Sequence, residues 1–417
     1  MLVKIKPTKK LDGQIKISGS KNSCLPILAI SLLTNKKMIL NNVPMISDIY
    51  DMMEILKELG IEIKCFPNEN KLILKRKRIK NELLIDEISK IRASYYVIPG
   101  MIGKHNNIKI KYPGGCNFMN RPIDFHILAL EKSGSIVIEK ENIIEIIKKK
   151  TKNNIYKFPK ASVGATINSI MLSLLSKKTS KIVDQTIEPE IRDFINCLVK
   201  MGADIKINKN EIIVKGGKKL KSVTYDIMPD RIELGSYILL ASSCNSNIEL
   251  TNIRTDAINY LMPFLNKLAI SYKFEKNKIK ITGNSKINNI DLIVRPYPNF
   301  PTDLQQILCA SLLNSNNESI IEDQVYPKRI SHIKELNKMG ANIEYDNESS
   351  KIKINKSTLQ GANLYAHDLR CGFALILASL NANSESSIDN FQVVNRGYED
   401  IISKLNKINI EIEILKK

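Results

Sequence analysis

Residues 113–122, PGGCNFMNRP, contain the side chain best suited to covalent chemistry: Cys116 follows two glycines and precedes Arg121 by five positions. Glycines permit backbone conformations that are closed to other residues, so this stretch can turn tightly over a small ligand. A cysteine in such a loop beside a cation is suited to act as a nucleophile or a proton donor. The alternative is a hairpin turn with an ordinary structural cysteine, and the spacing alone leaves both interpretations open.

Further reactive side chains stand where apolar helical patterns begin, in SGSKN (18–22), RAS (92–94), KASVGAT (160–166), PDRIE (229–233), FPTD (300–303) and DLR (368–370). Helix N-termini favour anions, and the planar or mobile cations of Arg and Lys bind phosphate and carboxylate. The cations in question are Lys21, Arg92, Arg121, Arg329, Arg370 and Arg396. Each one alone is better explained as a surface charge or a helix cap. Together they predict a substrate with several negative charges.

Asp303, in the sequence Pro-Thr-Asp at a helix start, has two possible roles. It could simply cap its helix, because Asp is a preferred N-cap residue. In a cationic site it could instead take a proton from a substrate hydroxyl.

An internal repeat organises the chain around these residues. Six times, an amphipathic helical pattern is followed by a short break and an alternating strand pattern. The breaks fall 67 to 74 residues apart, at Gly60, Gly134, Gly202, Ala269, Gly340 and Asn409. Each repeat is predicted to be helix–strand–helix–strand–strand, with hairpins such as 207–217 and 275–283.

The helical pattern that opens each repeat is almost wholly apolar, so we expect these helices to be buried and covered by sheets. That arrangement favours two compact domains over an open solenoid, whose terminal repeats would be polar. The sequence therefore predicts an α/β (α+β) fold with three repeats in each domain. The first domain would span 21–228 and carry the glycine-rich loop at about 112–122; the second would combine 1–20 with 229–417. We expect the ligand in a cleft between them.

The composition excludes several classes of protein. With 43% hydrophobic and 25% charged residues the chain is globular, and it has neither a membrane-spanning run nor a signal-peptide pattern. Seven dispersed cysteines without a CxxC or Cys/His cluster predict a cytoplasmic protein without a metal site. The net charge of +20 comes from lysines scattered along the whole chain. Since Trp and nucleic-acid motifs are absent, we expect neither a nucleic acid nor a membrane as partner.

The motifs above, with PGGC…RPIDFH (113–126) and RGYE (396–399), resemble those of the UDP-N-acetylglucosamine 1-carboxyvinyltransferases, in the enolpyruvyl transferase family. The resemblance covers essentially the whole chain and implies two domains, each an inside-out α/β barrel of three repeats. It implies transfer of the enolpyruvyl group of phosphoenolpyruvate to the 3-hydroxyl of UDP-N-acetylglucosamine, with release of phosphate, the first committed step of peptidoglycan synthesis. We expect no cofactor, since phosphoenolpyruvate is a co-substrate, and a monomer or weak homo-oligomer.

The resemblance also implies roles for individual residues. Cys116 would protonate the methylene of phosphoenolpyruvate and form a pyruvate or phosphoenolpyruvate adduct; a thiol with an ordinary pKa of about 8.5 is protonated at neutral pH. Asp303 would receive the sugar hydroxyl proton, and Lys21 and Arg396 would share in catalysis. The phosphoenolpyruvate site would comprise Lys21, Asn22, Arg121, Arg329, Arg370 and Arg396. The nucleotide-sugar site would comprise Arg92, Arg121, Pro122, Ile123, Asp124, Phe125, Lys160, Ala161, Ser162, Val163, Asp303 and Val325.

The chain departs from the family pattern at a few positions. Met119 stands where a glycine is usual after the loop cysteine, Pro327-Lys328 replaces an acidic-Asn pair before Arg329, and Asn395 replaces an aspartate before Arg396. None of these changes removes a proposed catalytic group.

Two alternatives remain at this point. A shikimate-pathway enolpyruvyl transferase would share the fold and phosphoenolpyruvate, but PGGC…RP and KASVGAT favour the nucleotide-sugar enzyme. A non-catalytic basic binding protein could retain the fold, but it would not need Lys21, Cys116 and Asp303 together with the arginines.

Overall fold

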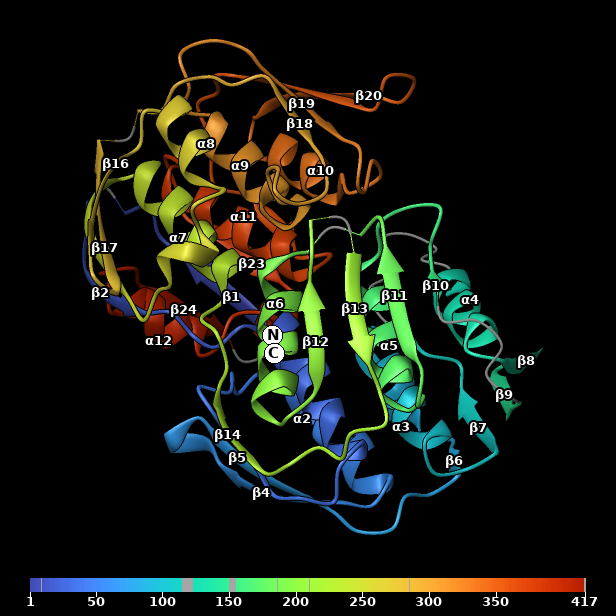
Figure 1. The fold of residues 1–417 in the computed structure, drawn as a ribbon. Coiled ribbons are helices and arrows are strands. Elements are labelled where there is room, and N and C mark those ends of the chain that lie inside the picture. The colour runs from blue at the N-terminus through green and yellow to red at the C-terminus, as the bar shows by residue number, and fades with distance from the viewer. Residues whose placement is uncertain are drawn as a thin grey trace. The chain divides into compact units, whose positions relative to one another are not determined.

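The computed structural model describes residues 1–8, 10–114, 123–149, 155–185, 187–209, 211–284 and 286–415. The chain divides into two compact units (Figure 1). Unit 1 comprises Met1–Ser18 and Pro229–Lys417, and unit 2 comprises Gly19–Met228. The chain passes from one unit to the other after Ser18 and after Met228, at the SGSKN and PDRIE motifs.

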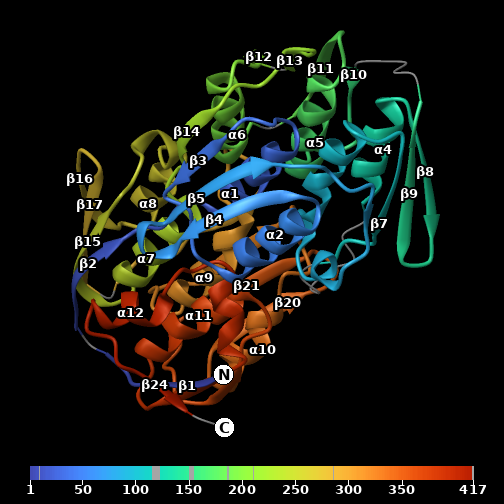
Figure 2. The ribbon, with the colours of Figure 1, turned by 90° about the horizontal axis from the view of Figure 1, so that it is seen from below.

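Unit 2 has apolar helices inside and strands outside. Its buried helices are α1 (Lys21–Ala29), α3 (Ile98–Ile102) and α5 (Val163–Leu174). One sheet has the order β14 (Val223–Asp226), β3 (Met38–Asn41), β5 (Lys71–Arg76), β4 (Ile61–Phe66), which can be followed in Figure 2. The other two run β6 (Glu82–Leu83), β7 (Asn107–Lys111), β9 (Ile143–Lys148), β8 (Ser135–Lys140), and β10 (Ile155–Tyr156), β11 (Thr179–Val183), β13 (Glu211–Lys215), β12 (Asp204–Ile207). The more amphipathic helices are α2 (Ser47–Glu58), α4 (Asp124–Lys132) and α6 (Pro189–Lys200).

Unit 1 repeats this plan. Its buried helices are α7 (Arg231–Ser242), α9 (Gln305–Leu312) and α11 (Leu369–Leu380). Its sheets run β16 (Ser271–Glu275), β17 (Lys278–Asn284), β15 (Asn245–Thr251), β2 (Lys10–Lys16); β18 (Leu292–Val294), β19 (Ser319–Asp323), β21 (Lys351–Asn355), β20 (Asn342–Asp346); and β22 (Asn363–Tyr365), β23 (Ser386–Asp389), β1 (Leu2–Ile5), β24 (Ile412–Leu415). The outer helices are α8 (Met262–Lys267), α10 (Ser331–Lys338) and α12 (Ile401–Asn406). The start of the chain therefore completes two sheets of unit 1.

All six sheets share one pattern of strand directions. An edge strand runs parallel to its neighbour, and two antiparallel pairs follow, as in β14–β3–β5–β4 and β18–β19–β21–β20. This confirms the predicted α/β fold and the order helix–strand–helix–strand–strand. The edge strands that follow the hairpins within the chain, β6, β10, β14, β18 and β22, were not predicted. β6 and β10 have only 2 residues each, which is too short to show an alternating pattern.

The six predicted breaks are structurally equivalent. All of them have positive φ: 96° at Gly60, 93° at Gly134, 94° at Gly202, 55° at Ala269, 87° at Gly340 and 65° at Asn409. Helices commonly end with one residue in this left-handed conformation, usually glycine or asparagine. Ala269 is therefore the least suitable residue in the series, because its Cβ opposes the conformation.

We expect Ala269→Gly to stabilise the protein by about 0.5–1 kcal/mol, since relief of the left-handed strain outweighs the extra entropy of glycine in the unfolded chain. Thermal unfolding measures this change as a small rise in Tm. Gly202→Ala is the matched control: its φ is +94° and a Cβ there would meet no atom closer than 3.9 Å, so only the backbone strain should lower Tm. A lower Tm for Ala269→Gly would contradict the strain argument.

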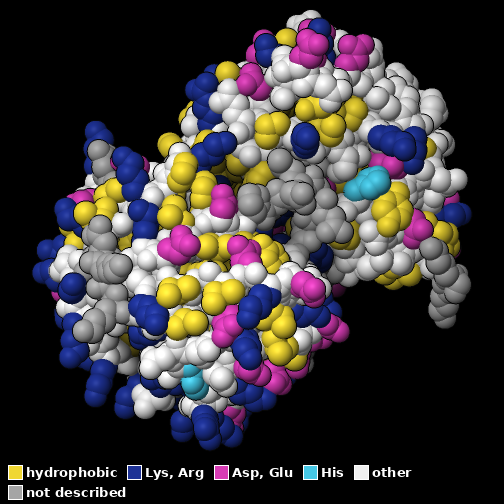
Figure 3. Space-filling model, turned by 90° about the vertical axis from the view of Figure 1, so that its right-hand side faces the viewer, with side chains coloured by type: hydrophobic (Ala, Val, Ile, Leu, Met, Phe, Trp, Pro, Cys, Tyr) yellow, Lys and Arg dark blue, Asp and Glu magenta, His cyan; other side chains and the backbone are white. Residues whose placement is uncertain are grey.

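The basic charge does not gather into a single patch on the face drawn in Figure 3. On the face in Figure 3, Lys and Arg are spread out with Asp and Glu among them. Many lysines have acidic neighbours, such as Lys80 with Glu58 at 2.6 Å and Lys57 with Glu54 at 2.7 Å. Within the described part of the chain, no helix is both long and apolar enough to cross a membrane.

Candidate active site

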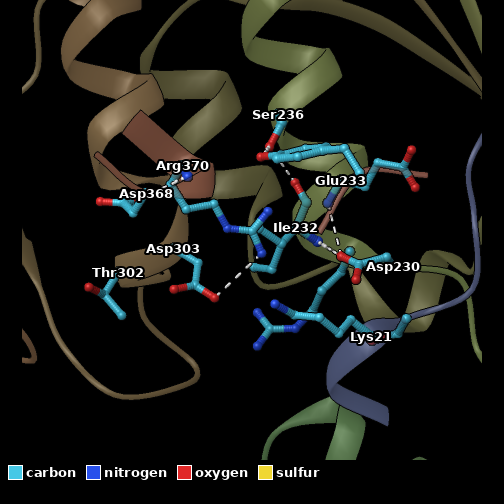
Figure 4. A network of polar contacts seen from close by, with 12 residues as sticks. Lys21, Asp230, Ile232, Glu233, Ser236, Thr302, Asp303, Asp368 and Arg370 are labelled. Carbon is cyan, nitrogen blue, oxygen red and sulfur yellow. Dashed lines mark hydrogen bonds and ion pairs between the residues drawn. The ribbon is translucent and has the colours of Figure 1, made fainter. Parts of the chain in front are cut away.

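Asp303 is the centre of a charged group in unit 1 (Figure 4). Its Oδ1 accepts a hydrogen bond from Nη1 of Arg329 at 2.6 Å, and its Oδ2 lies 3.7 Å from Nη2 of Arg370. The Asp303 side chain is 28% exposed, whereas those of Arg329 and Arg370 are 5% and 4% exposed. Asp303 does not cap a helix, because the N-cap of its short 3-10 turn, Thr302–Leu304, is Pro301. A partly exposed carboxylate thus contacts two buried guanidinium groups.

Both guanidinium groups stay protonated. Burial lowers the pKa of Arg329, but the Asp303 carboxylate raises it, and the net shift is upward. Burial likewise lowers the pKa of Arg370, while Tyr398 and Asp303 raise it by more. Each cation also lies over an aromatic ring, Arg329 at 5.1 Å from the Tyr326 centroid and Arg370 at 5.1 Å from that of Tyr398. The pair can therefore hold an anion with fixed positive charge.

Arg370 is held by the start of α11. Asp368 is the N-cap and accepts hydrogen bonds from the backbone N–H groups of Arg370 at 2.8 Å and Cys371 at 3.0 Å. Its other oxygen accepts from Ser331 at 3.2 Å and Gln306 at 3.4 Å, which ties α11 to α9 and α10. Nη1 of Arg370 is buried and has no hydrogen-bond partner among the described residues.

The equivalent helix in the first repeat of unit 1 is capped in the same way. Asp230 accepts from the backbone N–H groups of Ile232 at 2.8 Å and Glu233 at 2.9 Å (Figure 4). In unit 2, Ser20 caps α1 and Ser162 caps α5. The expected helix starts in these four repeats are therefore present. Each cap satisfies backbone donors that would otherwise lack partners.

Three other predicted residues are placed by their helices. Lys21 is the first residue of α1, and its Nζ lies 3.2 Å from Oδ2 of Asp48 on α2, with Asn22 beside it in the sequence. Arg396 ends the short helix Phe391–Arg396, two residues before Tyr398, the ring under Arg370. Lys21 and Asn22 belong to unit 2, and Arg396 belongs to unit 1.

A second group of predicted residues gathers around α4 and α5 of unit 2. The Arg92 guanidinium lies 5.7 Å from the Tyr95 ring, and Phe125 packs against Phe158 with ring centroids 5.9 Å apart. Ile123 is buried at the N-cap of α4, and Asp124, Lys160 and Ala161 are exposed. The remaining predicted residue, Val325, belongs to unit 1, where it is half-buried. Ser162 and Val163 form the start of α5.

His126 lies in the same group and was not among the predicted site residues, although the RPIDFH motif contains it. Its ring stacks on Tyr95 at 4.7 Å, and its Nδ1 lies 3.0 Å from Nδ2 of Asn168. Burial, with a smaller contribution from Arg92, lowers its pKa to about 3, so the imidazole is neutral. A Cβ on Gly164 would lie 2.8 Å from Cε1 of His126, so glycine is required at that position of α5.

Of the glycine-rich loop at about 112–122, the structure describes only residues 112–114. The backbone N–H of Gly114 donates to the carbonyl of Ile88 at 3.2 Å, and a Cβ at Gly114 would meet the Ser89 carbonyl oxygen at 1.7 Å. The backbone at Gly114 is therefore packed tightly against residues 88–89. Cys116, Met119, Asn120, Arg121 and Pro122 lie outside the described residues. Within the described part of the chain, no three His, Cys, Asp or Glu side chains are grouped to hold a metal ion.

Arg329 is held by defined contacts even though Pro327-Lys328 replaces the acidic-Asn pair that is usual before this arginine. The backbone N–H of Arg329 donates to the Tyr326 carbonyl at 3.0 Å, and its side chain reaches Asp303 as described above. Tyr345 donates to the Pro327 carbonyl at 3.3 Å. The missing acidic-Asn pair is therefore not needed to bring Arg329 to Asp303.

Each unit consists of three repeats, with buried helices inside and sheets outside, which defines an α/β protein. Its buried arginines beside an accessible carboxylate are typical of a protein that binds anions. The family model described as EPSP synthase (3-phosphoshikimate 1-carboxyvinyltransferase) matches residues 5–405. UDP-N-acetylglucosamine 1-carboxyvinyltransferase of Pelagibacter ubique is 39% identical over 411 residues, 97% of either chain. UDP-N-acetylglucosamine 1-carboxyvinyltransferase 2 of Staphylococcus aureus is 35% identical over 414 residues, covering 99% of this chain and 98% of that one.

Solved structures show the same fold. The enolpyruvyl transferase NikO from Streptomyces tendae is similar with a TM-score of 0.88 at 17% identity, covering 99% of this chain and 98% of that one. EPSP synthase from Acinetobacter baumannii is similar with a TM-score of 0.79 at 14% identity, covering 99% of this chain and all of that one, 100%. The chain therefore belongs to the enolpyruvyl transferase family, and the curated relatives compared with it above are UDP-N-acetylglucosamine 1-carboxyvinyltransferases.

Proposed function

We propose that this enzyme transfers the enolpyruvyl group of phosphoenolpyruvate to the 3-hydroxyl of UDP-N-acetylglucosamine and releases phosphate, the first committed step of peptidoglycan synthesis. The observation that carries the proposal is 35–39% identity over nearly the full length to enzymes of that name. The group of Asp303 with Arg329 and Arg370 supports it, because phosphoenolpyruvate is an anion with two charged groups. The shikimate-pathway alternative is not favoured: the EPSP synthase structures are only 13–14% identical.

The proposed chemistry uses one acid and one base. The Cys116 thiol gives a proton to the methylene carbon of phosphoenolpyruvate, while the sugar oxygen bonds to the neighbouring carbon and gives its proton to Asp303. Phosphate then leaves with the proton held by Asp303, and one proton of the new methyl group returns to the Cys116 thiolate, which restores both the double bond and the thiol. Fixed cations favour the charge that develops on the transferring group. The proposed phosphoenolpyruvate ligands are Lys21, Asn22, Arg121, Arg329, Arg370 and Arg396.

The nucleotide sugar is assigned mainly to the group around α4 and α5. We assign to it Arg92, Arg121, Pro122, Ile123, Asp124, Phe125, Lys160, Ala161, Ser162 and Val163, with Asp303 and Val325 from unit 1. Support comes from the proximity of Arg92, Phe125 and the α5 N-terminus, where backbone N–H groups favour phosphate. No cofactor or metal takes part in this proposal, and neither nucleic acid nor membrane is a partner. The proposed location is the cytoplasm, as a monomer or weak homo-oligomer.

A phosphate-release assay tests the function. Release above background should require both phosphoenolpyruvate and UDP-N-acetylglucosamine, and omission of either substrate is the control. Absence of release with both substrates present would refute the proposal. Release with shikimate 3-phosphate in place of the nucleotide sugar would show the alternative activity. Mass spectrometry of the peptide that contains Cys116, after incubation with phosphoenolpyruvate, tests the proposed adduct separately.

A further inference from the structure

A buried carboxylate, Asp323, joins two segments of the proposed site. Asp323 ends β19 and its side chain is almost fully buried. Its Oδ1 accepts from the backbone N–H groups of Val325 at 2.9 Å and Tyr326 at 2.8 Å. Its Oδ2 accepts from the Thr302 hydroxyl at 2.6 Å. One carboxylate therefore fixes both the residue before Asp303 and the loop that leads to Arg329.

The hydroxyl of Thr302 has a defined direction. Because Asp323 can only accept, the Thr302 proton points to Asp323, and the Thr302 oxygen is left to accept from Nη1 of Arg329 at 3.2 Å. The same Nη1 donates to Asp303 at 2.6 Å. The contacts thus connect Asp323, Thr302, Arg329 and Asp303, with a carboxylate at each end. Within this series, the hydroxyl of Thr302 accepts from Arg329 and donates to Asp323, so these two bonds strengthen each other.

We propose that Asp323 and Thr302 are positioning residues for the reaction, which set the place of Arg329 and thereby the orientation of the Asp303 carboxylate. Neither residue needs to touch substrate. Asp303 is partly exposed and follows Thr302 directly (Figure 4). Its orientation therefore depends on how Thr302 and its partner Arg329 are held. The expected effect on kcat rests on the proposed function, but the predicted geometry of Arg329 and Asp303 can be measured without an activity assay.

The test compares Thr302→Val with Thr302→Ser. Valine keeps the shape but removes the hydroxyl, so kcat should fall about 10- to 100-fold, the order expected for a displaced catalytic group. The KM for phosphoenolpyruvate should change less than kcat. Serine keeps the hydroxyl and should stay within about threefold of wild type, a rescue that a packing role would not give. Asp323→Asn should resemble Thr302→Val: the single amide oxygen is needed by the backbone N–H groups of Val325 and Tyr326, and the amide nitrogen then facing Thr302 cannot accept its proton.

Matched controls exist elsewhere in the chain. The buried Thr34 also donates one hydrogen bond, to the Leu220 carbonyl at 3.0 Å, and accepts one, from Lys36 at 3.1 Å. Asp346 accepts from the backbone of Glu348 and from the Ser349 hydroxyl, in an exposed turn. Thr34→Val and Asp346→Asn should leave kcat unchanged. Crystal structures should show a longer Arg329–Asp303 contact in Thr302→Val than in wild type.

The outcomes separate the two proposals. No phosphate release by wild type would refute the function, while the crystal structures would still decide the geometry. An active wild type with unchanged kcat in Thr302→Val, or with Thr302→Ser as impaired as Thr302→Val, would overturn the positioning role. If Asp323→Asn does not fold, the pair of Thr302 variants decides alone.

Discussion

Replacement of Asp303 by asparagine is expected to lower kcat by about 10²- to 10⁴-fold, the range typical of a lost general base. A carboxamide cannot take the proton of the sugar hydroxyl. It also removes the anion that lies 2.6 Å from Arg329 and 3.7 Å from Arg370, so two buried guanidinium groups lose their shared partner. The phosphate-release assay at saturating concentrations of both substrates measures the loss directly.

Two further variants separate the proton transfer from the charge. Asp303→Glu keeps a base and an anion, so it should retain more activity than Asp303→Asn even though its carboxylate is displaced. Asp346→Asn removes a carboxylate of the exposed turn and should leave kcat unchanged. Calorimetric binding of UDP-N-acetylglucosamine should still be measurable in Asp303→Asn. Turnover within fivefold of wild type in that variant would show that another group takes the proton.

The repeat was the part of the fold that could be predicted best. Helix ends that need a left-handed residue recur at a near-constant interval along the sequence. All six of these positions, of which Gly60 is the first and Asn409 the last, have positive φ and are therefore structurally equivalent. Helix starts could also be predicted, because capping depends on residues two or three positions away, as at Asp230 and Asp368. Local rules of this kind act over a few residues, so a single sequence reveals them.

The contacts that orient the site could not be predicted in the same way. Asp323 and Thr302 are 21 positions apart, and Lys404 and Glu233 are 171 apart, so no local pattern joins them. Asp303 shows the same limit: its position at a helix start suggested a cap equally well as a base, and only the arrangement of Arg329 and Arg370 showed its actual contacts. Side-chain pairing across repeats depends on the fold, which must be known first.

Loss of the Lys404 ammonium is expected to destabilise the protein by about 3–5 kcal/mol, the usual effect of removing one partner of a buried ion pair. Nζ of Lys404 lies 2.6 Å from Oε1 of Glu233, and the two side chains are 10% and 1% exposed. Glu233 keeps one hydrogen bond, from the backbone N–H of Ser18 at 2.8 Å. Lys404→Met preserves length and apolar packing, so a lower Tm would reflect the uncompensated carboxylate.

The pH dependence identifies the cause. Burial raises the pKa of Glu233 above its usual value, and Lys404 partly opposes this shift. Without Lys404 the pKa rises further. A carboxyl group whose pKa is higher in the folded state favours folding when protonated, and this contribution is lost as the pH rises through the folded pKa. The deficit of Lys404→Met should therefore be large at pH 7.5 and smaller at pH 5.

A double variant completes the argument for this pair. In Glu233→Gln/Lys404→Met neither charge remains, so its stability should exceed that of Lys404→Met and should lack the pH-dependent deficit, because desolvation no longer opposes folding. Lys4→Met, which removes one partner of an exposed pair with Glu385 at 3.0 Å, should change Tm little. A stability deficit of Lys404→Met that is equal at both pH values would instead assign the effect to lost packing. Protonation of the buried Glu233 carboxylate reduces the deficit at low pH, whereas a packing defect does not depend on pH.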